Sequence, residues 1–172
     1  MMRQMNFSKL ALLAAFAATL GGCTTQPVAG IARPDQSGKD EAAIRQLLAN
    51  TEKRINEGDL GFVDVFAKDA VIIAPSVPDI AGYDGIRAMY QDVMKQASMT
   101  VHFSTEEVAL AGDLAYEHGT YTLRMVDRKT GKVLQDVRNK HVHILKRQPD
   151  GSWKTWRMMV NSAEAQPAAK DR

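Results

Sequence analysis

The segment Gly112-Asp-Leu-Ala-Tyr-Glu-His-Gly-Thr-Tyr121 begins with a two-residue turn and continues as an alternating run, the pattern of a strand that leaves a hairpin. Two further turns follow it, at 127–132 and 148–151, and both are rich in Gly, Asp and Pro. These turns separate the strands of an antiparallel meander. We expect its four strands at about 100–111, 114–126, 133–147 and 152–162.

The chain before residue 100 has a helical period. A helix is predicted from Asp40 as N-cap to Gly58 by apolar residues spaced three and four apart. A second, shorter helix follows Asp59, residues 70–74 indicate a buried strand, and a third helix runs through 86–97. Three helices followed by a meander predict an α+β domain with the helices on one face of a curved antiparallel sheet.

Four strings are spread over this predicted domain: Phe66-Ala-Lys-Asp-Ala-Val-Ile-Ile-Ala-Pro75, Gly82-Tyr-Asp-Gly-Ile-Arg87, Gly112 to Tyr121 as quoted above, and Gln148-Pro-Asp-Gly-Ser-Trp-Lys154. Together they resemble the nuclear transport factor 2-like (NTF2-like) superfamily, in its bacterial SnoaL-like, ketosteroid-isomerase-like branch. The resemblance covers about residues 40–162 and implies a cone-shaped fold with a pocket between helices and sheet. It also implies a homodimer through the outer sheet face, with a salt-bridged monomer as the alternative.

The resemblance does not extend to the chemistry of ketosteroid isomerases. Those enzymes place a proton-abstracting Asp just before the Pro that follows the first strand, and this chain has Ala74 there. Their second Asp is protonated and donates a hydrogen bond to the oxyanion, and the predicted strand pairing places its position near His141. The superfamily includes isomerases, cyclases, dehydratases and plain binding modules, so the resemblance specifies the fold more closely than the function.

Antiparallel pairing predicts which side chains of the meander share a face, because opposed residues have a constant index sum. Val126 opposite Val133 pairs His118 with His141, Tyr116 with His143 and Thr120 with Asn139. Arg147 opposite Ser152 adds Trp156 beside His143 and Met158 beside His141. We assign these residues to the concave, helix-covered face and place Glu117 on the outer one. A one-residue slip in either turn reverses this assignment.

This face predicts a pocket with an acid–base group, since imidazoles titrate near neutral pH. We predict His118 and His141 as catalytic residues. The predicted ligand-binding residues are Tyr116, Asn139, His143, Trp156 and Met158. Three imidazoles on adjacent strands also permit a zinc site, but the spacing is not diagnostic, so we predict neither a metal nor a cofactor. A lining whose polar groups satisfy one another is the alternative to a functional pocket.

The first 23 residues predict export and lipid attachment. Arg3 and Lys9 precede an apolar run too short to span a bilayer, and Leu20-Gly-Gly-Cys23 resembles the lipobox of bacterial lipoproteins. We expect a signal peptide at 1–22, a lipidated Cys23 with a tether to residue 39, the domain at 40–162 and a disordered tail at 163–172. Thr24 follows the cysteine where an Asp would suggest inner-membrane retention, so the resemblance implies the outer membrane, facing the periplasm. A secretory signal with a chance cysteine is the alternative.

The formal net charge of +2 comes from Arg3 and Lys9 in the first 22 residues, so residues 23–172 have a net charge of zero. This charge balance does not favour binding to nucleic acid. Phosphate loops, a Ser-His-Asp signature and Cys-X-X-Cys are missing from the sequence. We therefore predict an envelope lipoprotein that binds a small, mostly apolar ligand. The alternatives are a lyase, isomerase or cyclase with a His acid–base, and a non-catalytic envelope interaction module. A cavity filled by its own side chains favours the last.

Overall fold

The structure, a computed structural model, describes residues 34–163. This part of the chain forms two α-helices, one 3-10 helix and a six-stranded sheet. In chain order the elements are α1 (Pro34–Asn56), η1 (Leu60–Val65), β1 (Phe66–Ile73), β2 (Ile80–Ala81), α2 (Tyr83–Gln96), β3 (Ala97–Ala111), β4 (Leu114–Asp127), β5 (Val133–Arg147) and β6 (Trp153–Ser162). The predicted α+β class is confirmed.

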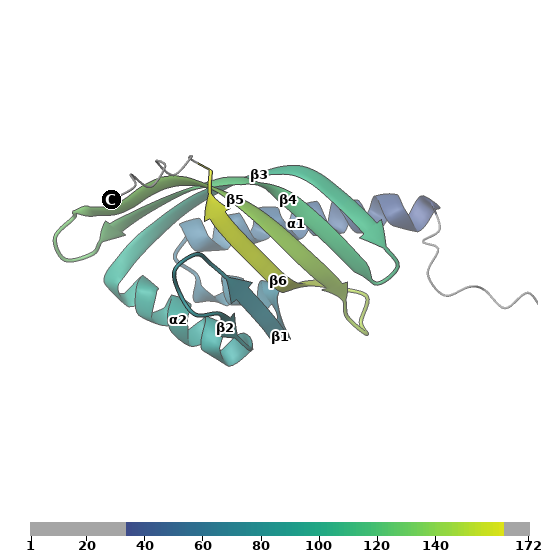
Figure 1. Cartoon of the computed structure of the whole chain (residues 1–172), viewed down its shortest axis with the longest axis horizontal. Helices are drawn as coiled ribbons and strands as arrows, with labels where there is room; N and C mark the ends of the chain where they lie inside the picture. Colours follow the sequence, from purple (N-terminus) through teal and green to yellow (C-terminus); the bar gives the residue numbers. More distant parts are fainter. Residues whose placement is uncertain (1–33, 164–172) are drawn as a thin grey trace, which may run out of the picture.

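The long strands β3 to β6 form the predicted meander and arch over the helices (Figure 1). The order across the sheet is β2-β1-β6-β5-β4-β3. The sheet is mixed rather than wholly antiparallel, because β1 pairs in parallel with β6 while the other neighbours are antiparallel. Helix α1 packs on β3, and α2 packs on β1 and η1. All three helical elements therefore help to close the space below the curved sheet.

The first helix begins earlier than its sequence predicts. It runs from Pro34, so the expected N-cap Asp40 lies within it and is buried. The Asp40 carboxylate instead accepts hydrogen bonds from Arg147 on β5. The predicted cap of the second helix is confirmed, since the Asp59 side chain accepts from the Gly61 N–H at 2.8 Å. A charged partner far along the chain thus outweighed the local capping preference of Asp40.

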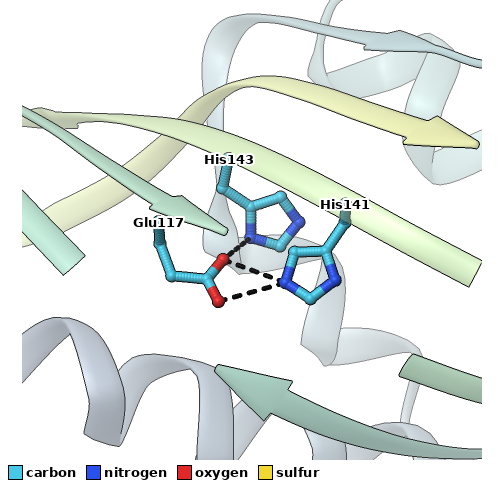
Figure 2. Close-up of side chains that lie close together, drawn as sticks. All are labelled: Glu117, His141 and His143. Carbon is cyan, nitrogen blue, oxygen red and sulfur yellow. Dashed lines mark hydrogen bonds and ion pairs between the residues drawn. The ribbon is translucent and has the colours of Figure 1, made fainter. Parts of the chain in front are cut away.

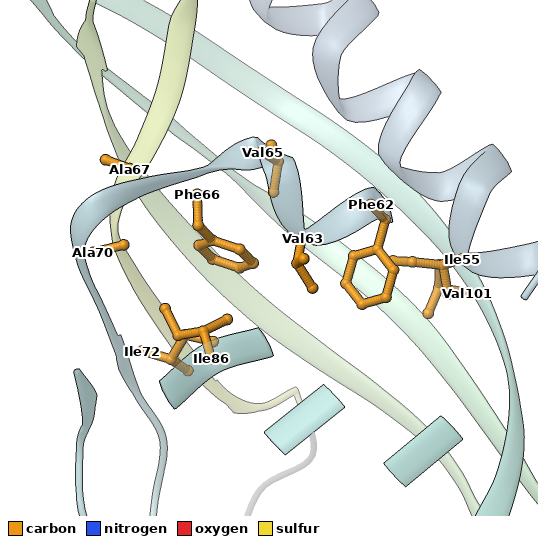
Figure 3. Packing of buried hydrophobic residues seen from close by; sticks show 10 residues of the cluster. All are labelled: Ile55, Phe62, Val63, Val65, Phe66, Ala67, Ala70, Ile72, Ile86 and Val101. Carbon is orange, nitrogen blue, oxygen red and sulfur yellow. The ribbon is translucent and has the colours of Figure 1, made fainter. Parts of the chain in front are cut away.

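Two clusters of apolar side chains fill the interior. The larger one lies where η1, β1 and α2 meet the sheet (Figure 3). Its members are Ile55, Phe62, Val63, Val65, Phe66, Ala67, Ala70, Ile72, Ile86 and Val101. The smaller one joins α1 to the start of β4, the end of β5 and the start of β6. Its members are Ile44, Leu48, Ala115, Leu145 and Trp153. The predicted stripe of α1 therefore faces the core, with Ile44 at 0% exposure.

Several expectations concern residues that the structure does not describe. The signal peptide at 1–22, the lipidated Cys23 and most of the tether lie outside residues 34–163, and so does the tail after residue 163. Residues 34–39 of the expected tether belong to α1. Neither α-helix of the described part is long and apolar enough to cross a membrane.

The register between β4 and β5 departs from the prediction by one residue. Val126 does pair with Val133, as expected, but Met125 then pairs with Gln135, so Leu134 forms a bulge. All later pairs shift: His118 lies opposite Val142, and Glu117 opposite His143. Even-numbered residues of β4 therefore point outward and odd-numbered ones inward. The prediction that Tyr116 and His118 share a face with His141 is wrong for this reason.

The register between β5 and β6 also differs from the prediction, and a second bulge contributes to the difference. Arg147 pairs with Trp153 rather than Ser152, and the register shifts again between Ile144 and Leu145. Met158 consequently lies opposite His143, and Val160 opposite His141. Trp156 falls in the bulge and has no partner among these pairs. The expected contact of Trp156 with His143 is therefore also wrong.

Gly119 is required where β4 passes the bulge of β3. A Cβ atom at this position would lie 2.1 Å from the carbonyl oxygen of Ser104 and 3.1 Å from the Cα of Thr105. We expect Gly119→Ala to lower the free energy of unfolding by about 2 kcal/mol, measured by urea denaturation, because the backbone of β3 must move. Gly85→Ala in α2 is the control, since a Cβ there meets nothing within 4 Å. Equal stability of the two variants would contradict this reading of the bulge.

Candidate functional site

Three ionisable side chains meet on the inner face of the sheet, below the arch of the strands. Glu117 comes from β4, and His141 and His143 come from neighbouring positions on β5 (Figure 2). All three are buried, at 0%, 2% and 4% exposure. Both carboxylate oxygens of Glu117 lie 3.0 Å from His141 Nε2, and its Oε2 lies 3.3 Å from His143 Nδ1. We call this group the inner cluster.

The carboxylate of the inner cluster is charged at neutral pH. Burial by itself raises the pKa of Glu117, but the hydrogen bond from His141, the two nearby imidazoles and a hydrogen bond from Thr105 outweigh it, so the pKa lies below its usual value. Since a carboxylate only accepts, His141 donates its Nε2–H to Glu117. This contact fixes the ring of His141 and its tautomer.

His143 is neutral at the same pH. Burial lowers the pKa of His143 to about 4, although the Glu117 charge acts in the opposite direction. The His141 and His143 rings stack, with centroids 4.8 Å apart. Phe103 and Tyr121 each approach the His141 ring, at 5.7 Å between centroids. Phe103 and Tyr121 therefore cover the His141 side of the inner cluster.

A narrow cavity borders the inner cluster on its His143 side. It has about 30 Å³ open to water-sized molecules, which is room for one or two waters. Its lining is mostly apolar and comes from α1, η1, β1, α2 and the inner face of the sheet. The lining residues are Leu48, Thr51, Ile55, Phe62, Val65, Phe66, Tyr90, Phe103, His143, Thr155 and Met158.

Several buried polar atoms of this region have no hydrogen-bond partner among the described residues. They are both ring nitrogens of His143, the Nδ1 of His141 and the Oγ1 of Thr155. His143 Nδ1 lies 3.3 Å from Glu117 Oε2 but is not aligned for a hydrogen bond. A buried polar group without a partner costs about 1–3 kcal/mol, so such groups usually mark a bound water, ion or ligand.

The structure brings together some of the predicted site residues. His141, His143, Asn139 and Met158 all belong to the inner side of the sheet, as predicted for them. Asn139 lies opposite Tyr121 at the edge of the inner cluster, and Met158 lines the cavity beside His143.

Three predicted site residues lie elsewhere. Tyr116 and His118 stack on each other on the outer face, and His118 Nε2 lies 3.1 Å from Glu107. Trp156 donates its indole N–H to Asp69, and the cations of Lys146 and Arg157 each lie 3.9 Å from its ring centre. Glu107 lies opposite His118 because the hairpin of β3 and β4 keeps a regular register from the pair Ala111–Leu114 up to the bulge.

Sequence reasoning missed Glu117, the central residue of the inner cluster. A Glu in an alternating strand is normally placed on the solvated face, and the predicted register, which lacks the bulge, supported that choice. The signal that could have found it is the pairing itself: with the bulge at Leu134, Glu117 falls opposite His143 and diagonal to His141. The two imidazoles then serve as polar partners for a buried carboxylate charge that would otherwise have none.

The comparisons with known proteins agree with this architecture. The family model of the SnoaL-like domain matches residues 36–159. No curated protein sequence matches the chain. Similar solved structures include a ketosteroid isomerase-like protein from Erwinia carotovora atroseptica, with 20% identity, a TM-score of 0.63, and coverage of 77% of this chain and 100% of that one.

Two further structures show the same fold. An NTF2-like superfamily protein from Salmonella enterica serovar Typhimurium has a TM-score of 0.67 at 13% identity, covering 78% of this chain and 99% of that one. ActVI-ORFA from Streptomyces coelicolor has a TM-score of 0.59 at 17% identity, covering 72% and 94%. The family model spans residues 36–159, which is most of the described part of the chain. The chain therefore belongs to the SnoaL-like domain family, and it shares the fold of the NTF2-like protein.

Proposed function

We propose that the domain binds a small, mostly apolar molecule in the cavity beside the inner cluster. The observation that carries this proposal is the unpaired His143 Nε2 and Thr155 Oγ1 at a cavity whose other lining is mostly apolar. Small-molecule sites have this composition: apolar walls with a few polar groups that fix orientation. The ligand we propose therefore has an apolar body and one polar group that meets His143 and Thr155.

The size of the cavity limits the ligand. Pockets for drug-sized molecules enclose roughly 300–1,000 Å³, and this cavity has about 30 Å³ open to water-sized molecules. A ligand of more than a few atoms must displace side chains. Met158 is the most adaptable of them, because its unbranched side chain changes rotamer at low cost.

Native mass spectrometry of the full chain against a library of small carbonyl compounds and phenols tests this proposal. We expect one bound molecule per chain, and we expect Thr155→Val to weaken binding by roughly 5–10-fold, since a lost hydrogen bond is worth about 1 kcal/mol. Thr122→Val is the matched control, because Thr122 lies on the exposed outer face of β4. If nothing binds, or if both variants bind as the wild type does, the cavity is only core and the interaction module is the better reading.

A second candidate function is catalysis by a His acid–base of lyase, isomerase or cyclase type. The Glu117–His141 pair favours it, since a buried carboxylate orients an imidazole for proton transfer. The test is hydrogen–deuterium exchange of a captured carbonyl ligand in D₂O. We expect His141→Gln to abolish exchange at the carbon next to the carbonyl and His118→Gln to leave it unchanged. Equal deuterium exchange with His141→Gln and His118→Gln would contradict a catalytic role for His141.

We also propose that the chain is anchored by lipid at Cys23 to the outer membrane, facing the periplasm. The support is the lipobox-like Leu20-Gly-Gly-Cys23 after a short apolar run, all outside the described residues. We expect Cys23→Ser to move the protein from the membrane fraction to the soluble periplasmic fraction, because two or more acyl chains are needed for stable anchoring. Immunoblotting of the fractions measures this, and an unchanged membrane fraction would contradict the anchor.

The outer face of the sheet supports the proposal of a homodimer. Large apolar side chains are exposed there among charged ones, including Leu134, Val142, Ile144 and Met159 at 37–53% exposure. We expect light scattering to give the mass of two chains and Val142→Glu to give the mass of one, since a charge at a buried contact is strongly unfavourable. A wild-type monomer would contradict the dimer.

A further inference from the structure

The inner cluster has the composition of a metal site. Glu117, His141 and His143 each offer one ligand atom, and these atoms lie within 4.8 Å of one another. Two imidazoles with one carboxylate are a donor set that proteins use for catalytic zinc and for other first-row divalent ions. His102 and His118 are not part of it, since each lies beside a different Glu on an exposed surface.

The separations of both imidazole nitrogens from the carboxylate of Glu117 suit a shared ion. An ion bound at about 2.0–2.2 Å by nitrogen and oxygen holds neighbouring ligands about 3.0–3.5 Å apart, depending on geometry. The measured separations from Glu117 Oε2 are 3.0 Å to His141 Nε2 and 3.3 Å to His143 Nδ1. Because the three side chains come from two paired strands, the sheet holds their backbones at this spacing without an ion.

The hydrogen bonds of the protein alone leave the cluster incomplete. His143 is buried and has no hydrogen-bond partner among the described residues, although Glu117 lies next to it. An ion would use the lone pair of His143 Nδ1, which the protein leaves unused. The adjoining cavity has room for one or two waters, so a water can complete the coordination.

The charge of the cluster also favours a cation. Glu117 is anionic and both rings are neutral ligands when bound to metal, so the site has a net charge of −1 before an ion enters. A divalent ion gives a net charge of +1, beside the aromatic rings of Phe103 and Tyr121. Hard oxygen-binding ions such as Mg²⁺ are disfavoured by two imidazole ligands.

We propose that Glu117, His141 and His143 form a binding site for one divalent first-row transition-metal ion, with zinc as the probe. This inference goes beyond the proposed ligand and does not depend on it. It competes with the acid–base role of His141, because Nε2 can bind an ion only after the ring changes tautomer, with the proton that Nε2 shares with Glu117 carried by Nδ1 instead. It also departs from the sequence-based prediction of no metal, which considered His118 as the third ligand.

Zinc titration of the full chain, purified with chelator and then freed of it, tests the site by calorimetry at pH 7.5. We expect one ion per chain, with Glu117→Gln and His143→Gln each weakening binding by roughly 100-fold or more, since even second-shell changes cost 10–100-fold. His118→Gln is the control and should bind as the wild type does. Binding that is lost with His118→Gln and kept with His143→Gln would place the ion on the outer face and overturn the proposal.

A measurement on the wild type keeps the test valid if a buried variant fails to fold. In ¹⁵N-resolved NMR spectra of the histidine rings, zinc should shift the signals of His141 and His143 and leave those of His102 and His118 in place. Elemental analysis after purification without chelator then identifies the ion carried from the cell. A chain that shows no ring shifts at saturating zinc would refute the site. Binding of the small molecule is measured separately on the metal-free chain, so the metal site and the ligand proposal can each fail without the other.

Discussion

Replacing Asp40 with alanine is expected to lower the free energy of unfolding by about 3 kcal/mol, measured by urea denaturation at pH 7.5. Asp40 is 4% exposed and accepts hydrogen bonds from Arg147, with 2.7 Å between Arg147 Nη1 and Oδ1, and from the indole N–H of Trp153 at 3.3 Å. Breaking a buried ion pair leaves the remaining charge without its partner, which costs about 3–5 kcal/mol. Arg147 is partly exposed, which places the expected loss at the lower end.

The matched control is Asp113→Ala, because Asp113 binds the same guanidinium from a turn. Its side chain is 84% exposed, and it accepts from Arg147 Nε at 3.1 Å. Exposed ion pairs are worth about 0–1 kcal/mol, so this variant should lose less than about 1 kcal/mol. If both variants lose the same stability, burial is not what makes the Asp40 contact strong, and the link between α1 and β5 is weaker than we infer.

Acidification is expected to destabilise the metal-free domain already at pH values well above those at which acid usually unfolds proteins. The unfolded chain protonates His143 near its ordinary pKa of 6.5, while burial holds the folded pKa at about 4. The unfolded state therefore binds more protons between these values, and stability falls as pH falls through this window. The linkage gives a loss of about 2 kcal/mol between pH 7.5 and pH 5.0. Urea unfolding at both pH values, with chelator present, measures it.

The variant His143→Gln isolates this effect, because glutamine does not titrate. Its stability should change by about 2 kcal/mol less than that of the wild type over the same interval, whatever its stability at pH 7.5. Glu117 adds a loss of the same sign at lower pH, since its pKa is below the usual value and its stabilisation disappears as pH falls below about 4.5. A wild-type curve that stays flat from pH 7.5 to 5.0 would contradict the buried, neutral His143.

The local sequence predicted much of the fold because its signals act over short distances. The turn residues at 112–113, 127–132 and 148–151 separate the strands that the structure contains, and the stripe of α1 faces the core as predicted. The parallel pairing of β1 with β6 was not predicted, because these strands lie far apart in the chain and no turn joins them. The early start of α1 was missed for a related reason, since Asp40 is held by Arg147 more than a hundred residues later.

The candidate site was predicted in part, and the errors have a single cause. His141 and His143 occupy the inner face, but Glu117 replaces His118 as their neighbour. Hairpin turns define pairing only near the turn, and each bulge adds one residue to one strand. After one bulge, every side chain of β4 exchanges faces relative to the prediction.

By itself, the sequence determined the α+β class, the order of most elements and the alternation that places every second residue of β5 on one face, because these depend on neighbours in the chain. Only the tertiary structure decided that Glu117, His141 and His143 meet. The bulges at Leu134 and Trp156 set the register, and packing of the whole sheet against α1, η1 and α2 selects where a bulge is stable. The contact among these three buried polar groups exists only in the packed domain, because residues far apart in the chain together determine which register has the lowest free energy.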